Sequence, residues 1–274
     1  SLQRKAIFDA LQCGVMILTG GPGTGKTTVV RALLHIFKSM DLRVALAAPT
    51  GRAAKRLSES TQSEAKTIHR LLEMEYGDTD GEGGAHFRRD ETNLLEEDVI
   101  IIDEASMVGN GLMCSLLKAI KPGARFIIIG DADQLPSVEA GNVLRDLLDS
   151  GCFSTVCLTE IFRQAEESLI VTNAHAINRG DMPRLDVKDK DFFFLRRDTD
   201  RDIVLTVADL YKIRLPRTYG EITKEGIQVI SPSRKGEGGT ENLNILLQEG
   251  LNPAGGGKAQ YRYRDRVYRE GDRV

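Results

Sequence analysis

The stretch "GGPGTGKTT", residues 20–28, decides the fold of this chain because it joins a glycine-rich turn to a lysine and two threonines. It contains the pattern G-x-x-x-x-G-K-[ST], follows the apolar run "GVMILTG" and precedes a segment with helical spacing, which predicts a strand, a phosphate-binding loop and a helix. In such a loop, glycines let backbone N–H groups turn toward a phosphate, and the amino terminus of the helix adds a favourable dipole. Lys26 is predicted to contact the outer phosphates, and Thr27 to offer an oxygen to Mg²⁺. The residues expected to hold a nucleotide are Gly21, Gly23, Thr24, Gly25, Lys26, Thr27 and Thr28.

Three further apolar runs alternate with helical patterns along the first half of the chain. They are "RVALAAPT", "DVIIIDEAS" and "RFIIIGD". Buried strands that alternate with helices predict an α/β fold, with a parallel sheet covered by helices on both faces. Each run ends in polar residues, and ligands of such sheets bind at the carboxyl ends of the strands.

Two of these strand ends carry side chains suited to nucleotide hydrolysis. Asp103 and Glu104 follow one strand, where one carboxylate can hold Mg²⁺ and its neighbour can polarise an attacking water. Gln134 follows another strand in "GDADQLPSV", where its amide can contact a γ-phosphate or orient water. Together with the phosphate loop, these residues predict hydrolysis of a nucleotide rather than binding alone.

The length of 274 residues suggests two domains, and the helical segment "GNVLRDLLDSG" places the boundary between residues 150 and 151. Residues 1–150 are predicted to form the first domain, with a polar, glycine-rich excursion over 76–97. Residues 151–252 repeat a strand–helix–strand rhythm, with strands expected in "DFFFLRR" and "GIQVISPSRKG". Residues 253–274 are predicted to be β-rich.

The alternating tail "YRYRDRVYR" places Arg262, Arg264 and Arg266 on one side of a predicted β-ribbon, with Tyr261 and Tyr263 on the other. Stacking plus charge is suited to binding a single strand of nucleic acid, and a charged edge strand that discourages aggregation is the alternative.

The composition is that of a soluble globular protein, with 41% hydrophobic and 28% charged residues and no apolar run long enough for a membrane span. A net charge of −3 argues against coating DNA through a global basic field but allows a local DNA groove. The four cysteines form no C-x-x-C pair, so they are expected to be buried free thiols in a reducing, cytoplasmic setting.

Six segments resemble, in order, the motifs of superfamily 1 DNA helicases: "GGPGTGKTT", "LAAPTGRAAKRLSE", "TIHRLL", "IIIDEASMV", "GDADQLPSVEAGNVL" and "LTEIFRQ". The wording is closest to the RecD-like branch, which includes the exodeoxyribonuclease V alpha subunit, and "ISPSRKGEGGTENLNILLQEGLNP" is also similar to that branch. The resemblance implies a P-loop NTPase with two RecA-like domains, ATP between them and single-stranded DNA across them. It also implies 5′-to-3′ translocation in DNA repair or recombination, other subunits of a helicase–nuclease complex as possible partners, and an SH3-like β insertion that begins in the tail.

The resemblance also implies roles for individual residues. Gln3 would read adenine, Asp103 would hold Mg²⁺ and Glu104 would be the general base. Gln134 would sense the γ-phosphate, and Arg163 would reach it from the second domain. With Lys26, the residues Glu104, Gln134 and Arg163 form the implied catalytic set. The implied DNA contacts are Pro49, Thr50, Gly51, Arg52, Thr67 and His69.

Several of these residues have plainer alternatives. Gln3 can be a frayed surface residue, Arg163 a structural ion-pair partner, and Arg52 the solvated face of a helix. His69 can be a core histidine. Arg234 and Lys235 in "SPSRKG" fit a solvated turn as well as a DNA or nucleotide contact, and His175 is expected to pack within its helix.

The sequence departs from the helicase pattern near its end. A further DNA-contacting motif and a second ATP-contacting arginine are not found before Val274, so the chain is expected to be an excised core whose second domain is incomplete and whose turnover is weak. The helicase half of a conjugative relaxase shares these motifs and is one alternative. A nucleotide-dependent assembly module is another, although such a module has no need of Glu104 or Gln134.

Overall fold

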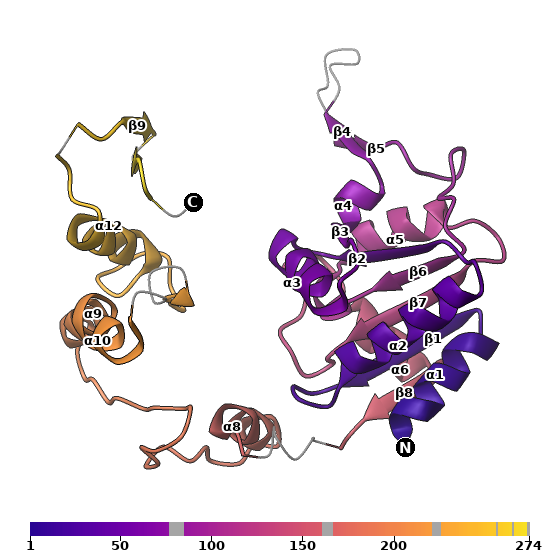
Figure 1. Cartoon of the computed structure of the whole chain (residues 1–274), viewed down its shortest axis with the longest axis horizontal. Helices are drawn as coiled ribbons and strands as arrows, with labels where there is room; N and C mark the ends of the chain where they lie inside the picture. The colour runs from indigo at the N-terminus through magenta and orange to yellow at the C-terminus, as the bar shows by residue number, and fades with distance from the viewer. Residues whose placement is uncertain (77–84, 161–166, 221–225, 256, 265, 273–274) are drawn as a thin grey trace. The chain divides into compact units, whose positions relative to one another are not determined.

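A computed structural model of the chain describes residues 1–76, 85–160, 167–220, 226–255, 257–264 and 266–272. The chain divides into two compact units, Ser1–Phe193 (unit 1) and Phe194–Val274 (unit 2), and each is described by itself (Figure 1). Among the described residues, no helix combines the length and the apolar character needed to cross a bilayer.

Unit 1 is built on a parallel six-stranded sheet with the order β3-β2-β6-β7-β1-β8. Its strands are β1 (Val15–Gly20), β2 (Val44–Ala48), β3 (Lys66–Thr67), β6 (Val99–Ile102), β7 (Arg125–Gly130) and β8 (Ser154–Leu158). Because parallel strands require a crossover between them, a helix or loop between consecutive strands returns the chain to the end of the sheet at which the strands begin. The predicted α/β fold with a parallel sheet is confirmed for this unit.

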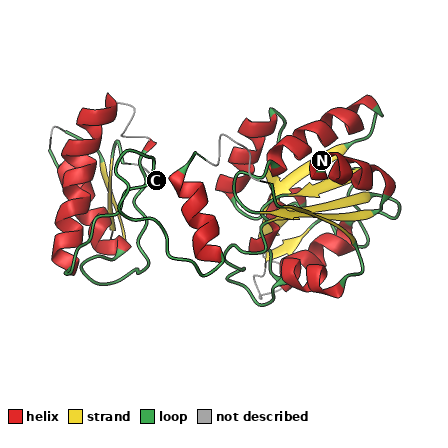
Figure 2. Cartoon of the chain, turned by 90° about the horizontal axis from the view of Figure 1, so that it is seen from below, coloured by secondary structure: helices red, strands yellow, loops and turns green. Residues whose placement is uncertain are grey.

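The helices of unit 1 form a layer on each face of the sheet, and Figure 2 shows red helices on both sides of the yellow strands. One face is covered by α1 (Leu2–Gln12), α2 (Lys26–Ser39) and α3 (Gly51–Thr61). The other is covered by α4 (Ile68–Leu71), α5 (Asn110–Ala119) and α6 (Val143–Ser150). The 3₁₀ turn η1 (Ala105–Met107) joins β6 to α5, and α8 (Leu169–Asn178) follows β8 along the chain.

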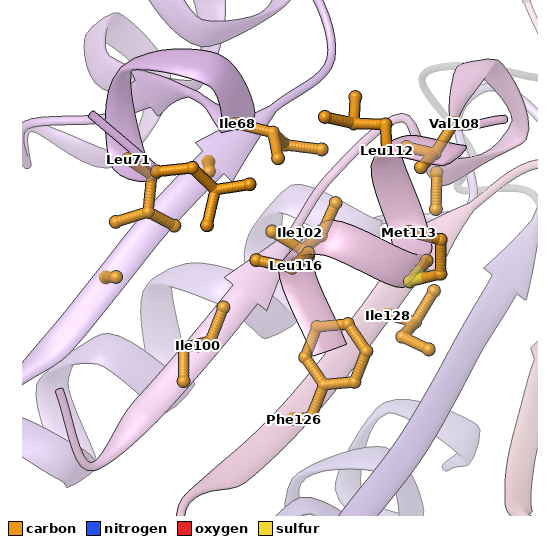
Figure 3. Packing of buried hydrophobic residues seen from close by; sticks show 14 of the residues in the cluster. Ile68, Leu71, Ile100, Ile102, Val108, Leu112, Met113, Leu116, Phe126 and Ile128 are labelled. Atoms are coloured by element: carbon orange, nitrogen blue, oxygen red, sulfur yellow. The ribbon is translucent and has the colours of Figure 1, made fainter. Parts of the chain in front are cut away.

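Side chains of the central strands alternate between these two layers, which explains why the strands read as unbroken apolar runs. Ile127 and Ile129 of β7 pack with α1 and α2, whereas Phe126 and Ile128 pack with α5 and α6. Figure 3 shows Phe126 and Ile128 facing Leu116 and Met113 of α5. A strand buried on both faces has no polar side, so period-two alternation is absent from its sequence.

The predicted excursion over residues 76–97 begins within a small antiparallel hairpin of β4 (Met74–Tyr76) and β5 (Ala85–Phe87). The structure places the division of the chain later than the predicted boundary at 150/151. The reason is β8, which lies beyond that boundary yet pairs with β1 along the edge of the first sheet, from Met16–Ser154 to Gly20–Leu158.

Unit 2 differs from the predicted second parallel sheet. Its described helices include α9 (Asp200–Asp209), the π-helical turn η2 (Leu210–Arg214), α10 (Leu215–Tyr219) and α12 (Thr240–Leu251). Its described strands are β9 (Gln260–Tyr263) and β10 (Arg266–Arg269), which form an antiparallel hairpin. The strands expected in "DFFFLRR" and "GIQVISPSRKG" are not found: residues 191–197 and the described residues 226–236 contain no strand.

Two smaller predictions are also corrected. The tail does not form one continuous alternating ribbon, because Arg264 adopts a positive φ of 53° at the turn between β9 and β10 and its guanidinium lies over the ring of Tyr263, 5.3 Å from its centroid. Cys114, Cys152 and Cys157 are exposed rather than buried, although all four cysteines are free thiols as expected.

Candidate nucleotide-binding site

The loop between β1 and α2 has the backbone of a phosphate cradle. Gly23 and Gly25 have φ values of 75° and 87°, in the left-handed region that a side chain disfavours. Thr24 is buried, and its hydroxyl donates a 2.8 Å hydrogen bond to the carbonyl of Gly21. The loop is therefore held by its own side chain and opens onto the amino terminus of α2, where backbone N–H groups have no helical partner.

The Lys26 ammonium bonds to this loop rather than standing free. Its Nζ donates to the carbonyl of Gly20 at 2.6 Å and to that of Gly21 at 3.2 Å. Thr27 and Thr28 are exposed on the first turn of α2. A phosphate held by Lys26 must therefore exchange with these carbonyls, and the two threonine hydroxyls are accessible to a ligand.

Asp103 and Glu104 follow β6 and are both half-buried. The backbone N–H of Glu104 donates a 2.9 Å hydrogen bond to Oδ1 of Asp103, and Glu104 itself has a φ of 54°. Left-handed backbone at a residue other than glycine costs free energy, and such strain gathers at functional sites.

Burial is the main cause that raises the pKa of both carboxyl groups. For Glu104, the negative charges of Asp103 and Asp131 raise the pKa further, whereas the positive charges of Lys26 and Arg56 lower it. The pKa of Asp103 is lowered in part by its hydrogen bond from Glu104 and by Lys26. The site thus concentrates negative charge that is only partly neutralised.

Asp131 and Gln134 follow β7, the strand between β6 and β1. Asp131 is only 3% exposed, and its carboxylate accepts hydrogen bonds from the Asp133 N–H at 3.1 Å and from the Gln134 amide at 3.3 Å. Gln134 is exposed. The buried Asp131 therefore orients the candidate sensor, a role that sequence analysis missed although the acid immediately follows a predicted strand.

The donor set fits a divalent cation in the form in which Mg²⁺ is usually held. Thr27 and Asp103 each offer one oxygen, and Mg²⁺ commonly takes one or two protein oxygens together with substrate phosphates and waters. Within the described ranges there is no group of three His, Cys, Asp or Glu side chains arranged for a metal.

Gln3 lies beside the phosphate loop. Its side-chain Nε2 donates a 3.4 Å hydrogen bond to the carbonyl of Gly25, and the residue is half-buried in α1. This contact argues against a frayed surface residue. Arg163 lies outside the described residues.

The six residues predicted to contact DNA lie just after β2 or at and just after the end of β3: Pro49, Thr50, Gly51, Arg52, Thr67 and His69. The two strands are neighbours, with Ala48 paired to Thr67, so the structure brings both motifs to one edge of the sheet. These residues lie next to the candidate nucleotide residues, because the N–H of Asp103 donates a 2.9 Å hydrogen bond to the carbonyl of Ala47 in β2.

Two of these residues also have a structural role. The hydroxyls of Thr50 and Thr67 cap α3 and α4, accepting hydrogen bonds from the N–H groups of Ala53 at 3.2 Å and Arg70 at 3.1 Å. His69 is half-buried and lies against Phe87 of the β4–β5 hairpin, with ring centroids 5.9 Å apart. Arg52 is exposed on the first turn of α3.

Two other candidates lie differently from expectation. The Nε2 atom of His175 lies 3.3 Å from the carbonyl oxygen of Pro22, so this histidine of α8 contacts the phosphate loop rather than only its own helix. Arg234 forms an ion pair with Glu241 at 2.7 Å on an exposed surface, which agrees with a solvated turn.

Comparison with known proteins shows which family the chain resembles. A family model described as an AAA domain matches residues 1–193, the same residues as unit 1. The chain is 38% identical over 259 residues to a protein of Deinococcus radiodurans named "ATP-dependent RecD2 DNA helicase", covering 94% of this chain and 33% of that protein. It is 44% identical over 204 residues to "RecBCD enzyme subunit RecD" of Mycobacterium tuberculosis strain H37Rv, covering 65% of this chain and 34% of that protein.

Among solved structures, the Pif1 helicase of Candida albicans is similar, with 22% identity, 80% of this chain and 54% of that chain covered, and a TM-score of 0.49. The resemblance to RecD-like helicases that the motif order predicts is confirmed by the two curated relatives. The chain spans about a third of the length of each.

Proposed function

The chain belongs to the AAA domain family, and we propose that it is the ATP-driven motor part of a DNA helicase or translocase that acts on single-stranded DNA. The observation that carries the proposal is the carboxyl edge of the unit 1 sheet. The ends of β1, β7 and β6 present the phosphate loop, the Asp131–Gln134 pair and the Asp103–Glu104 pair, and β2 beside them presents the candidate DNA motif.

In this proposal the phosphate loop and Lys26 bind the phosphates of ATP. Thr27 and Asp103 hold Mg²⁺, which when bound neutralises charge on the phosphate oxygens. Glu104 accepts a proton from the attacking water, and the exposed amide of Gln134, tethered to Asp131, contacts the γ-phosphate or orients that water. Gln3 reads adenine beside the loop, and Arg163 supplies positive charge to the γ-phosphate.

The DNA part of the proposal rests on the edge formed by β2 and β3. Gly51 is the first residue of α3, and a side chain added there would meet no atom within 4 Å. The packing around this position therefore does not require glycine. A phosphate that approaches the capped amino terminus of α3 gives this glycine a reason, because backbone N–H groups there are available to an anion.

Coupling between the two parts follows from their connection through adjacent strands. The backbone N–H of Asp103 donates a hydrogen bond to Ala47 of β2, and the residues that follow β2 are the candidate DNA contacts. A movement of β6 relative to β2 on hydrolysis would therefore change the geometry of both the nucleotide site and the candidate DNA contacts. The 5′-to-3′ direction, a place in repair or recombination and a cytoplasmic setting are part of the same proposal and rest on the motif resemblance alone. Association with other subunits is also part of it, and is supported by the relative named as a subunit of the RecBCD enzyme.

The test is ATP hydrolysis by this chain with and without single-stranded DNA, measured under single-turnover conditions so that slow turnover is still visible. We expect DNA to raise the rate and Lys26→Ala to reduce it to background. Lys38→Ala is the matched control, since Lys38 lies in the same helix and bonds to Ser63 at 3.0 Å, away from the loop.

Unchanged hydrolysis in Lys26→Ala would show that the site is assigned wrongly. ATP hydrolysis that does not respond to DNA would contradict the helicase proposal and favour a nucleotide-dependent assembly module.

A further inference from the structure

The imidazole of His175, in α8, contacts the phosphate loop. Its Nε2 lies 3.3 Å from the carbonyl oxygen of Pro22, and the residue is half-buried. A carbonyl only accepts hydrogen bonds, so Nε2 carries the proton in this contact. At the amino terminus of α8, Asp191 accepts hydrogen bonds from the N–H groups of Leu169 and Ile170 at 2.7 and 3.2 Å.

The ring also packs against Gly21. A Cβ atom built on Gly21 would lie 2.5 Å from Cε1 of His175 and 3.3 Å from each ring nitrogen, and these are the three nearest atoms to it. Gly21 does not have a left-handed φ, in contrast to Gly23 and Gly25. A side chain at position 21 would therefore have to displace the histidine ring, whereas the backbone conformation does not itself call for glycine.

The contact between His175 and Pro22 sets the direction of a backbone N–H donor in the phosphate loop. In a trans peptide the C=O of one residue and the N–H of the next point in opposite directions. Fixing the Pro22 carbonyl toward His175 therefore fixes the Gly23 N–H toward the opposite side. Gly23 has a φ of 75° and tolerates rotation of this peptide more easily than other residues would, so an external anchor is needed to keep one orientation.

We propose that His175 is a positioning residue of the nucleotide site, which holds the Pro22–Gly23 peptide in the orientation that presents the Gly23 N–H to a phosphate. The inference rests on the proposed nucleotide-binding function. Because the hydrogen bonds of the loop are made in the ground state and in the transition state alike, His175 contributes to binding and not to the chemical step.

The test is a double-mutant cycle between Gly21 and His175, read out as the dissociation constant for a fluorescent ATP analogue with Mg²⁺. We expect Gly21→Ala to weaken binding about 3- to 10-fold, because the new methyl group displaces the ring and breaks its hydrogen bond to Pro22. His175→Ala is expected to weaken binding about 3- to 10-fold, the loss of one hydrogen bond. The double variant is expected to bind within about 2-fold of His175→Ala, since the overlap is gone.

A conservative variant and a matched control separate positioning from folding. His175→Gln keeps an N–H donor and is expected to restore binding to within about 2-fold of the parent chain. Ile177→Ala changes an exposed side chain of the same helix, 58% exposed, and is expected to have no effect. In hydrolysis assays His175→Ala should raise KM and leave kcat within about 3-fold of the parent chain, a split that general loosening of the fold would not produce.

Equal effects of Gly21→Ala in both backgrounds, or a failure of glutamine to restore binding, would overturn the proposal. The contact itself is tested without nucleotide by the NMR signals of the His175 ring, which should shift in Gly21→Ala and not in Ile177→Ala. An unshifted ring signal would overturn the inference alone. If the ring signal shifts in Gly21→Ala but the parent chain binds no ATP analogue, the proposed function is overturned and the contact between His175 and the loop stands.

Discussion

Replacing Glu104 by glutamine is expected to separate nucleotide hydrolysis from nucleotide binding. The side chain is half-buried at the end of β6, and its pKa is raised by burial and by the charges of Asp103 and Asp131. Glutamine has nearly the same shape, so the packing around η1 is retained. The change removes the proton acceptor and one of three neighbouring negative charges.

The expected magnitudes follow from these two losses. A positioned general base contributes about 10²- to 10⁴-fold to a rate, so hydrolysis should fall by that factor. ATP carries negative charge, and only Asp103 and Asp131 remain to repel it in the variant. Affinity for ATP should therefore be unchanged or higher, which distinguishes this variant from Lys26→Ala.

The pH dependence follows from the direction of the pKa shift. Glu104 acts as a base only when it is deprotonated, and its pKa lies above the ordinary value of 4.5. Hydrolysis by the parent chain should therefore fall as the pH falls through this raised pKa, at a higher pH than an exposed glutamate would cause. In Glu104→Gln this acid limb should disappear from the residual rate.

The assay is single-turnover hydrolysis at saturating ATP over a range of pH, with ATP affinity measured in parallel. Glu59→Gln is the control, because Glu59 is an exposed residue of α3 paired with Lys55 at 4.0 Å. A loss of less than about 10-fold in Glu104→Gln would refute the assignment of the base. A large fall in affinity would refute the electrostatic reasoning.

Two further predictions concern stability. Thr50→Ala removes the cap of α3 and should cost about 1 kcal/mol of folding free energy, which lowers the melting temperature of a unit of this size by roughly 2–4 °C. Thr50→Ser keeps the hydroxyl and should keep the melting temperature of the parent chain. Equal melting temperatures of Thr50→Ala and the parent chain in thermal circular dichroism would contradict the role of Thr50 as a cap. Asp103→Asn should raise the melting temperature of the nucleotide-free chain at neutral pH, because the folded protein loses stability as the pH rises through the raised pKa of this carboxyl group. The gain in melting temperature should therefore shrink on acidification, and a gain that does not depend on pH would argue against the pKa as its cause. Asp149→Asn, at an exposed site, is the control.

The fold of unit 1 could largely be predicted from its sequence because each central strand is an apolar run that ends in glycine, proline or acid. The boundary was misplaced because β8 gives only a short local signal. Its place is fixed by pairing with β1, about 140 residues earlier in the chain, and such a long-range pairing is not visible in a local pattern.

The same distinction explains the candidate site. The motifs predicted which strand ends carry the functional side chains, since the ends of parallel strands meet at one edge. They did not predict that Lys26 bonds to its own loop, that Asp131 orients Gln134, or that His175 reaches Pro22. These contacts depend on how loops close in space, for which spacing along the chain carries no information.

Unit 2 shows the limit of apolar patterning more sharply. Phe194 and Ile230 lie in the two runs predicted to be strands, yet their side chains are 50% and 86% exposed and neither run forms a ladder. A parallel strand gains hydrogen bonds only from a neighbour brought by a long crossover, so its pattern alone does not stabilise it. The tail hairpin of β9 and β10 forms from a less apolar sequence because its two strands are separated by two residues, and closing so short a loop costs little entropy. Proximity along the chain, and not hydrophobicity, decides which of these segments becomes a sheet.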